Sequence, residues 1–267
     1  MYSTSMTVKG IAMKRVSILQ WVNLVATVAM ISVNVLANAL PINGLNTGEI
    51  SDRFPIFFVP AGYVFSIWGL IYIGLITFAI YQALPAQREN AAVVRIGYLY
   101  ALSSVANIVW IFLWHYTRFV LTLPAMLVIL ASLILIFLGL WDRRRELTSA
   151  DRWAMFGPFS VYLGWISVAT VANVTQVLYY LNWGGWGIGP QAWAVVMLVV
   201  AAAIGVAMSL RHANVAYVAV FVWAYVGIAV KHWSTPAVGL TAAVLAGLLA
   251  VAMVLSVPRR SRLWAAP

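Results

Sequence analysis

The sequence predicts an all-α integral membrane protein with about eight transmembrane helices and both termini in the cytoplasm. Of the 267 residues, 64% are hydrophobic and only 8% are charged, whereas soluble domains carry about a quarter charged residues. Apolar runs long enough to cross a hydrocarbon core about 30 Å thick recur along the whole chain. The chain has no cysteine, which excludes disulfides and thiolate metal sites.

Eight candidate spans follow from the apolar runs and from the residues that interrupt them. The spans cover about residues 16–40, 60–84, 97–115, 119–141, 153–181, 191–210, 214–230 and 235–257. Pro41 and Pro85 are expected to end helices, and Pro190 and Pro236 to begin them. The first apolar run is about 25 residues long, well beyond the core of a signal peptide, so it is expected to remain as a span.

The positions of the charged residues predict the orientation. With the N-terminus in the cytoplasm, 13 of the 16 Lys and Arg residues lie on the cytoplasmic side, and only Arg53, Arg118 and Lys231 lie outside. This bias follows the positive-inside rule, so the net charge of +10 indicates topology and no nucleic-acid partner. All six acidic residues lie in loops, which weighs against a pump, a proton-coupled transporter, a charged-ring channel and a hydrolase.

The histidines and Lys231 raise two further alternatives. His115 and His232 both lie at outer span ends, which would allow a bis-histidine haem, but axial ligands normally project from within helices. Interfacial histidines beside an aromatic belt fit the sequence better. Lys231 has no carboxylate counter-ion at membrane depth, so a retinal Schiff base is not expected. We expect no metal site and no catalytic residue.

Uncharged polar residues and aromatic rings share the predicted spans. Asn107 and Trp110 lie in the third span, and Trp165 and Asn173 lie in the fifth. Hydrogen bonding between helices would explain the polar residues, and an interfacial belt would explain most tryptophans. Trp68 and Trp165 fit the belt poorly because they lie well inside their spans, and apolar walls with a few polar groups are typical of a ligand pocket.

Three segments in register carry a family resemblance. PAGYVFSIWGLIY at the second span, SSVANIVWIFLW in the third and GPFSVYLGWISVATVANVTQVLYYLN in the fifth resemble the tryptophan-rich sensory protein family (TspO/MBR, the translocator-protein family). The resemblance covers about residues 16–183. Two departures stand out: the second proline of the family's entrance motif is Ala61 here, and three spans follow that have no counterpart in the five-helix family.

The resemblance implies a five-helix bundle whose pocket opens toward the first outer loop, which would act as a lid. Trp68 and Trp165 would be paired pocket tryptophans. The ligand would be a porphyrin-type or haem-type tetrapyrrole or a sterol-like planar molecule, no cofactor would be required, and two copies would form a homodimer among membrane lipids. The expected ligand-binding residues are Tyr63, Phe65, Trp68, Asn107, Trp110, Trp165, Ala169 and Asn173.

The chain is therefore expected to have four parts. These are a cytoplasmic segment (1–15), a TspO/MBR-like five-helix unit (16–183), three additional helices (184–257) and a basic cytoplasmic tail (258–267). The expected role is a receptor, sensor or carrier in a bacterial inner membrane. A facilitative transporter of an uncharged lipophilic metabolite and a porphyrin-degrading enzyme remain alternatives, the enzyme being the less favoured.

Overall fold

The computed structural model describes residues 2–40 and 42–264, and all regular elements of this part of the chain are helices. The long helices are α1 (Tyr2–Ala39), α3 (Ile67–Ala83), α5 (Leu99–His115), α6 (Phe119–Asp142), α8 (Gly157–Tyr180), α9 (Pro190–His212), α10 (Val215–Lys231) and α11 (Pro236–Trp264). The short elements are η1 (Ile42–Gly44), α2 (Thr47–Asp52), η2 (Gly62–Ser66), η3 (Pro85–Gln87), α4 (Ala91–Ile96), α7 (Ser149–Asp151), the π-helical turn η4 (Arg152–Phe156) and η5 (Gly185–Gly187).

Eight apolar helices account for the eight predicted spans. Six helical segments of the described chain are long and apolar enough to cross a membrane. The other two, α5 and α10, are apolar and have 17 residues each, which gives a length of about 25 Å, near the lower limit for a spanning helix. The protein is a multi-pass membrane protein.

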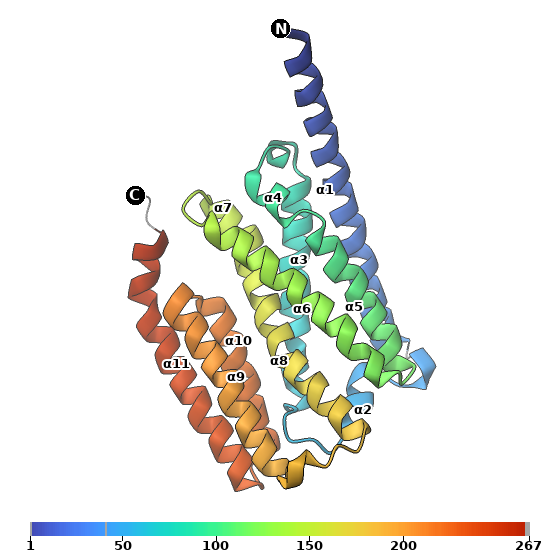
Figure 1. Ribbon diagram of the computed structural model, residues 1–267, viewed down its shortest axis with the longest axis vertical. Coiled ribbons are helices and arrows are strands. Elements are labelled where there is room, and N and C mark those ends of the chain that lie inside the picture. Colours follow the sequence, from blue (N-terminus) through green and yellow to red (C-terminus); the bar gives the residue numbers. More distant parts are fainter. Residues whose placement is uncertain (1, 41, 265–267) are drawn as a thin grey trace.

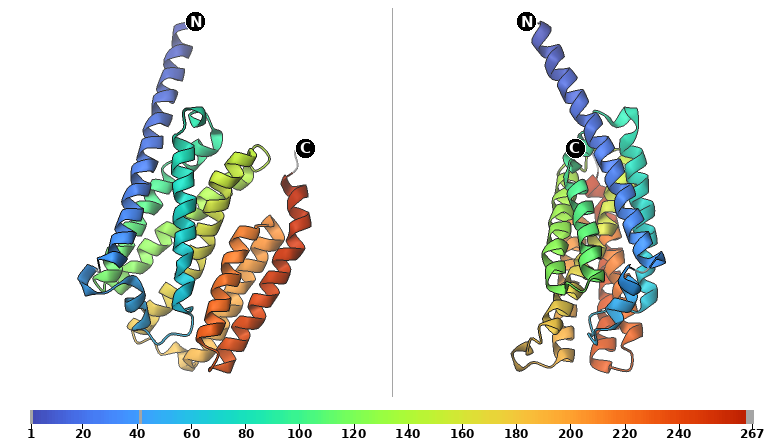
Figure 2. Two further views of the ribbon diagram at one scale, coloured as in Figure 1. Left: turned by 180° about the vertical axis from the view of Figure 1, so that it is seen from behind. Right: turned by 90° about the vertical axis from the view of Figure 1, so that its right-hand side faces the viewer.

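The arrangement of the helices agrees with the predicted orientation. Both termini lie at the same end of the bundle, together with α4 and α7, whereas α2 lies at the opposite end (Figures 1 and 2). The basic loop between α6 and α8 is therefore on the side of the termini, as the positive-inside rule requires. The helices extend further than the predicted spans, because α1 begins at Tyr2 and α11 continues through Pro258 to Trp264.

The first five long helices and the last three meet along α8 and α10 (Figure 1). A Cβ atom on Gly164 of α8 would lie 3.0 Å from the Tyr217 carbonyl oxygen and 3.1 Å from Val220 Cβ on α10. The absence of a side chain therefore permits the close approach of the two helices, as small residues do in membrane bundles. Asn214 Nδ2 also donates to Ser160 Oγ across this contact at 2.9 Å.

The glycine-rich turn between α8 and α9 is held by three tryptophans. Trp183, Trp186 and Trp193 pack with ring centroids 5.2–5.8 Å apart. The indole N–H of Trp193 donates to the Gly185 carbonyl at 2.8 Å. The turn therefore fixes how the chain passes from α8 to α9.

Candidate ligand-binding site

Five aromatic side chains form a cluster between the outer part of η2 and α3 and the middle of the span that contains α8. Trp68 packs edge-on against Trp165 with ring centroids 6.3 Å apart, and against Tyr162 at 6.0 Å. Phe65 packs edge-on against Trp165 at 5.7 Å, and Tyr72 stacks on Trp68 at 5.5 Å. Trp165 is only 3% exposed. The structure thus brings together three residues of the predicted site, and the rings fill the space between the helices.

Helical spacing and one close contact explain why these rings meet. Rings three or four residues apart on α3 and on α8 lie on one face of each helix. Gly74 of α3 faces Pro158 of α8, and a Cβ atom at Gly74 would lie 2.9 Å from Pro158 Cβ. The two helices can therefore approach closely enough for their aromatic faces to interdigitate.

Asn107 joins this cluster through a tyrosine hydroxyl. Its side-chain amide donates to Tyr162 Oη at 3.4 Å, and its Oδ1 accepts a hydrogen bond from Asn34 Nδ2 at 2.7 Å. All three side chains are buried. Asn107 therefore links α1, α5 and α8 next to the ring cluster. This position suits both a hydrogen bond that joins helices and a residue that lines a pocket.

Trp110 and Asn173 form a second group. The Trp110 indole N–H donates to Asn173 Oδ1 at 3.2 Å, and Asn173 Nδ2 donates to Thr122 Oγ1 at 2.8 Å. Trp110 also stacks on Trp114 with centroids 5.1 Å apart. Ala169 lies one turn before Asn173 on α8 and is partly buried against the core. One face of α8 therefore carries residues of both groups.

Tyr63 does not join either group. It is 46% exposed and packs edge-on against Trp223 of α10, with ring centroids 5.4 Å apart. Tyr72 and Tyr162 belong to the cluster but were not predicted. Their spacing of four residues from Trp68 and three from Trp165 places them on the same helix faces and could have revealed them. No local pattern could have revealed the contact of Trp223, which comes from a helix far along the chain.

The first outer loop (residues 42–59) has a structure of its own. Asn46 and Glu49 form a capping box at α2, in which each side chain accepts a hydrogen bond from the other residue's backbone N–H. His115 Nδ1 bonds to the Ile42 carbonyl and His115 Nε2 bonds to Thr47 Oγ1, both at 3.1 Å. Both ring nitrogens of His115 are therefore engaged by the loop, which argues against the bis-histidine haem.

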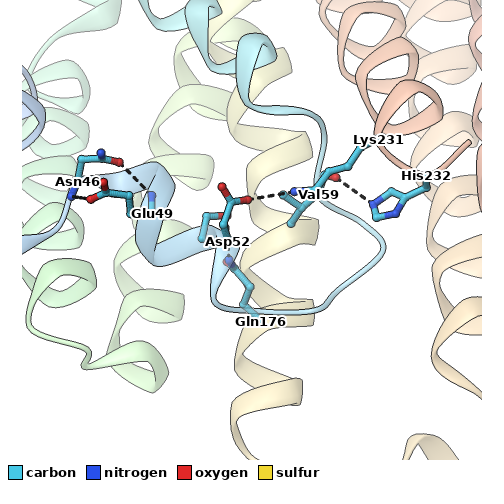
Figure 3. A network of polar contacts seen from close by, with 8 residues as sticks. Asn46, Glu49, Asp52, Val59, Gln176, Lys231 and His232 are labelled. Carbon is cyan, nitrogen blue, oxygen red and sulfur yellow. Dashed lines mark hydrogen bonds and ion pairs between the residues drawn. The ribbon is translucent and has the colours of Figure 1, made fainter. Parts of the chain in front are cut away.

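The end of α10 fastens the far side of the same loop (Figure 3). Lys231 Nζ pairs with Asp52 Oδ1 at 3.1 Å. His232 Nε2 donates to the Val59 carbonyl at 3.3 Å. The helices that follow the five-helix unit thus contact the loop that the resemblance identifies as the lid.

The segment by which the loop re-enters the membrane (residues 60–66) is built against α10. The backbone N–H of Ala61 donates to the Gly227 carbonyl at 3.1 Å, and the Trp223 indole N–H donates to the Val64 carbonyl at 3.0 Å. Pro60 and Val64 pack where a side chain at Gly227 would project. A proline at position 61 would lack this N–H, so the departure from the family's motif coincides with a bond to α10.

A shallow apolar groove of about 340 Å³ opens beside this segment. It lies between η2, α3, α8 and α10 and is lined by Ser66, Ile67, Leu70, Val161, Ala216, Ala219, Val220 and Trp223. Two of these residues are chain neighbours of Phe65 and Trp68. The groove therefore lies next to the ring cluster, at the junction of the two parts of the bundle.

Acidification is expected to loosen the outer loop at His232. Burial lowers the pKa of His232 below its ordinary value; the Val59 carbonyl opposes this shift and the charge of Lys231 adds to it. Because the folded-state pKa is lowered, the neutral His232 side chain contributes stability that is present above about pH 6.5. This stability is lost as the pH falls through the folded-state pKa. A spin label on Arg53→Cys should become several-fold more mobile at pH 5 than at pH 8.

The control replaces His232 with glutamine, which keeps an N–H donor but does not titrate in this range. The Asp52–Lys231 ion pair beside this histidine is unchanged in the variant. Label mobility in His232→Gln should therefore depend little on pH. A pH response of equal size in this variant would show that another group is responsible.

Together, the bundle and the enclosed aromatic cluster define a helical membrane protein with a candidate site for an apolar ligand. The chain belongs to the family of TSPO-like proteins, whose model matches residues 20–255. The matched range continues past residue 183, so it includes α9, α10 and most of α11 as well as the first five spans. Family membership indicates a membrane-bound sensor or ligand-binding role.

Comparisons with curated proteins and with solved structures found no match. Among residues 2–40 and 42–264, no three His, Asp or Glu side chains come together to hold a metal ion. The ligand must therefore be inferred from the apolar and aromatic character of the site.

Proposed function

We propose that the protein is a membrane receptor or sensor that binds a planar hydrophobic ligand, a porphyrin-type tetrapyrrole, between α3 and α8 beneath the first outer loop. The observation that carries this proposal is the edge-to-face packing of Phe65, Trp68 and Trp165 in an uncharged part of the bundle. Conjugated planar ligands gain about 0.5–1.5 kcal/mol per aromatic contact beyond the burial of area.

Binding requires the rings to separate. Trp165 is almost fully buried by its neighbours, so a ligand can reach it only when Trp68 or Phe65 moves. Both residues lie within a few positions of the segment that α10 holds. Ligand binding is therefore coupled to movement of the outer loop, which is a suitable basis for sensing.

The remaining parts of the proposal rest on family membership and composition. The predicted polar wall is Asn107, Trp110, Ala169 and Asn173, with Tyr63 at the entrance. No cofactor is needed for this role, and a homodimer in the bacterial cytoplasmic membrane is the proposed setting. Residues 16–183 would hold the ligand, and the three further helices would support the lid.

The test is a titration of purified protein with protoporphyrin IX, followed by tryptophan fluorescence. The wild type should show saturable quenching, and Trp68→Phe with Trp165→Phe should weaken binding about tenfold or more, because two stacking partners become smaller. The matched control is Trp153→Phe with Trp233→Phe, which removes two indoles that are 83% and 63% exposed. Equal loss in both double variants would contradict the proposed site.

The same preparation separates the alternatives. A receptor releases the porphyrin chemically unchanged and does not carry it across liposomes. Movement of ligand into liposomes would favour the facilitative transporter, and irreversible loss of the porphyrin absorption bands would favour the degrading enzyme. Competition by a sterol without porphyrin quenching would assign the site to sterol-like ligands.

A further inference from the structure

The cytoplasmic end of α11 is held by two arginines of the connection between α6 and α8. Arg144 Nε donates to the Leu263 carbonyl at 3.1 Å, and Arg144 Nη1 donates to the Trp141 carbonyl at 3.1 Å. Arg152 Nη2 lies 3.5 Å from the Trp264 carbonyl. Two guanidinium groups, from separate elements, thus contact the last turn of α11 through backbone carbonyls.

Two tryptophan rings, Trp141 and Trp264, pack against these guanidinium groups. The Trp141 and Trp264 ring centroids are 6.3 Å apart. The Arg144 guanidinium lies 4.4 Å from the Trp141 centroid, and those of Arg152 and Arg260 lie 4.6 and 5.9 Å from the Trp264 centroid. Three guanidinium groups from three elements therefore converge on two indole rings. We call these five residues the arginine–tryptophan cluster.

No carboxylate of residues 2–40 or 42–264 forms an ion pair with this cluster. The ion pairs within the described chain are Arg143–Glu146 and Lys231–Asp52, so none of the three guanidinium groups has a carboxylate partner there. The Asp151 carboxylate at this end already accepts hydrogen bonds from Tyr81, Asn90 and Thr148. Arg144 and Arg152 are partly buried, whereas Arg260 is exposed. A partly buried cation without an anion is costly, and carbonyls and ring faces compensate only in part.

A buried donor in the cluster also lacks an acceptor. Trp264 is 7% exposed, and its indole N–H has no hydrogen-bond partner among the described residues. An indole nitrogen can only donate. The Nδ1 atom of His212, whose ring packs 4.7 Å from Trp141, is likewise buried without a partner. A buried indole donor and three guanidinium groups thus meet where the described residues supply no carboxylate partner.

We propose that the arginine–tryptophan cluster binds the phosphate group of an anionic phospholipid in the cytoplasmic leaflet. A phosphodiester carries the charge and the acceptor oxygens that the cluster lacks, and arginine recognises phosphate through paired N–H groups. The cluster lies at the cytoplasmic ends of α6 and α11, where lipid headgroups lie, and basic pockets between helices on this side bind anionic headgroups. The bound lipid holds the last turn of α11 against the α6–α8 connection.

The experiment is native mass spectrometry of the full chain in detergent, titrated with phosphatidylglycerol or with phosphatidylcholine. Wild type should retain phosphatidylglycerol at least about tenfold more tightly than phosphatidylcholine. Arg144→Gln with Arg152→Gln should abolish most of this preference. The matched control is Arg145→Gln with Arg211→Gln, which removes the same charge from exposed positions at the same end and should keep the preference.

The arginine substitutions also remove hydrogen bonds to the last turn of α11. A second variant therefore tests the site while leaving these bonds in place. Trp264→Phe keeps an aromatic ring against Arg152 but removes the indole N–H donor. It should weaken phosphatidylglycerol binding about tenfold. Trp153→Phe, at an exposed tryptophan on the same side, should have no effect.

Three outcomes would overturn the proposal. These are equal retention of the two lipids, equal loss of preference in both double arginine variants, and full phosphatidylglycerol affinity in Trp264→Phe. Displacement of the lipid by inorganic phosphate at equal concentration would reassign the site to a soluble phosphate.

Discussion

Gly227→Ala should destabilise the protein and release the segment by which the outer loop re-enters the membrane. The new Cβ atom would lie 2.1 Å from Val64 Cγ2 and 3.1 Å from Pro60 Cβ. Neither side chain is long enough to swing away, so the segment must shift from α10. Overpacking of this kind costs about 1–3 kcal/mol, and thermal unfolding in detergent should show a midpoint several degrees lower.

Two control variants test whether the close contact at Gly227 causes the loss of stability. Gly247→Ala on α11 has open space around its new Cβ atom, and should be neutral or stabilising by up to about 1 kcal/mol because alanine favours helix. Val64→Ala combined with Gly227→Ala removes the clashing atom and should recover much of the loss. If Gly227→Ala and Gly247→Ala behave alike, the close contact with α10 does not exist in solution.

Asn173→Leu should cost about 1 kcal/mol and loosen the contact of α5, α6 and α8. Asn173 accepts from the Trp110 indole and donates to the Thr122 hydroxyl. Its replacement leaves the Trp110 indole N–H unpaired, whereas the Thr122 hydroxyl still donates to the Phe119 carbonyl. Each unpaired buried group costs about 1–3 kcal/mol in soluble proteins. Hydrogen bonds between membrane helices average nearer 0.6 kcal/mol, which places the expected cost at the lower end of this range.

Two further variants isolate the hydrogen bonds of Asn173. Thr175→Val, on the same helix, removes a hydroxyl that bonds only to its own helix at the Val171 carbonyl, and should change the unfolding midpoint little. Adding Trp110→Phe to Asn173→Leu removes the orphaned indole N–H, and the double variant should lose less than the sum of the single losses. Strict additivity would show that the two residues do not interact.

The same variants address the role of Asn173 in ligand binding. If Asn173 lines the porphyrin site, Asn173→Leu should weaken porphyrin quenching even at temperatures where the variant is fully folded. Unchanged quenching would leave Asn173 as a residue that only joins helices.

Much of this architecture can be predicted from the sequence because the bilayer constrains it strongly. Span lengths follow from the hydrocarbon thickness, and the orientation follows from Lys and Arg positions, so the eight helices and the common side of the termini were predictable. The Trp68–Trp165 contact was predictable only through the resemblance, because neither hydropathy nor spacing specifies which helices become neighbours.

The contacts of the last three helices could not be predicted. Lipid-facing and helix-facing surfaces are equally apolar, so hydropathy does not distinguish them. For the same reason the burial of Trp264 could not be predicted. Its position is typical of an interfacial belt, but it is buried against the Arg152 guanidinium. Likewise, Tyr63 lies near the start of a span but packs on Trp223, 160 positions along the chain from it.

The bond from Ala61 to Gly227 bears on whether this protein can be divided into independent modules. A fragment ending near residue 183 would keep every ring of the α3–α8 cluster but would lose the acceptor for the Ala61 N–H and the indole that holds the Val64 carbonyl. In hydrocarbon, each unpaired backbone group costs several kcal/mol. A shortened version, or a chimaera that exchanges the outer loop between relatives, must therefore carry α10 with it.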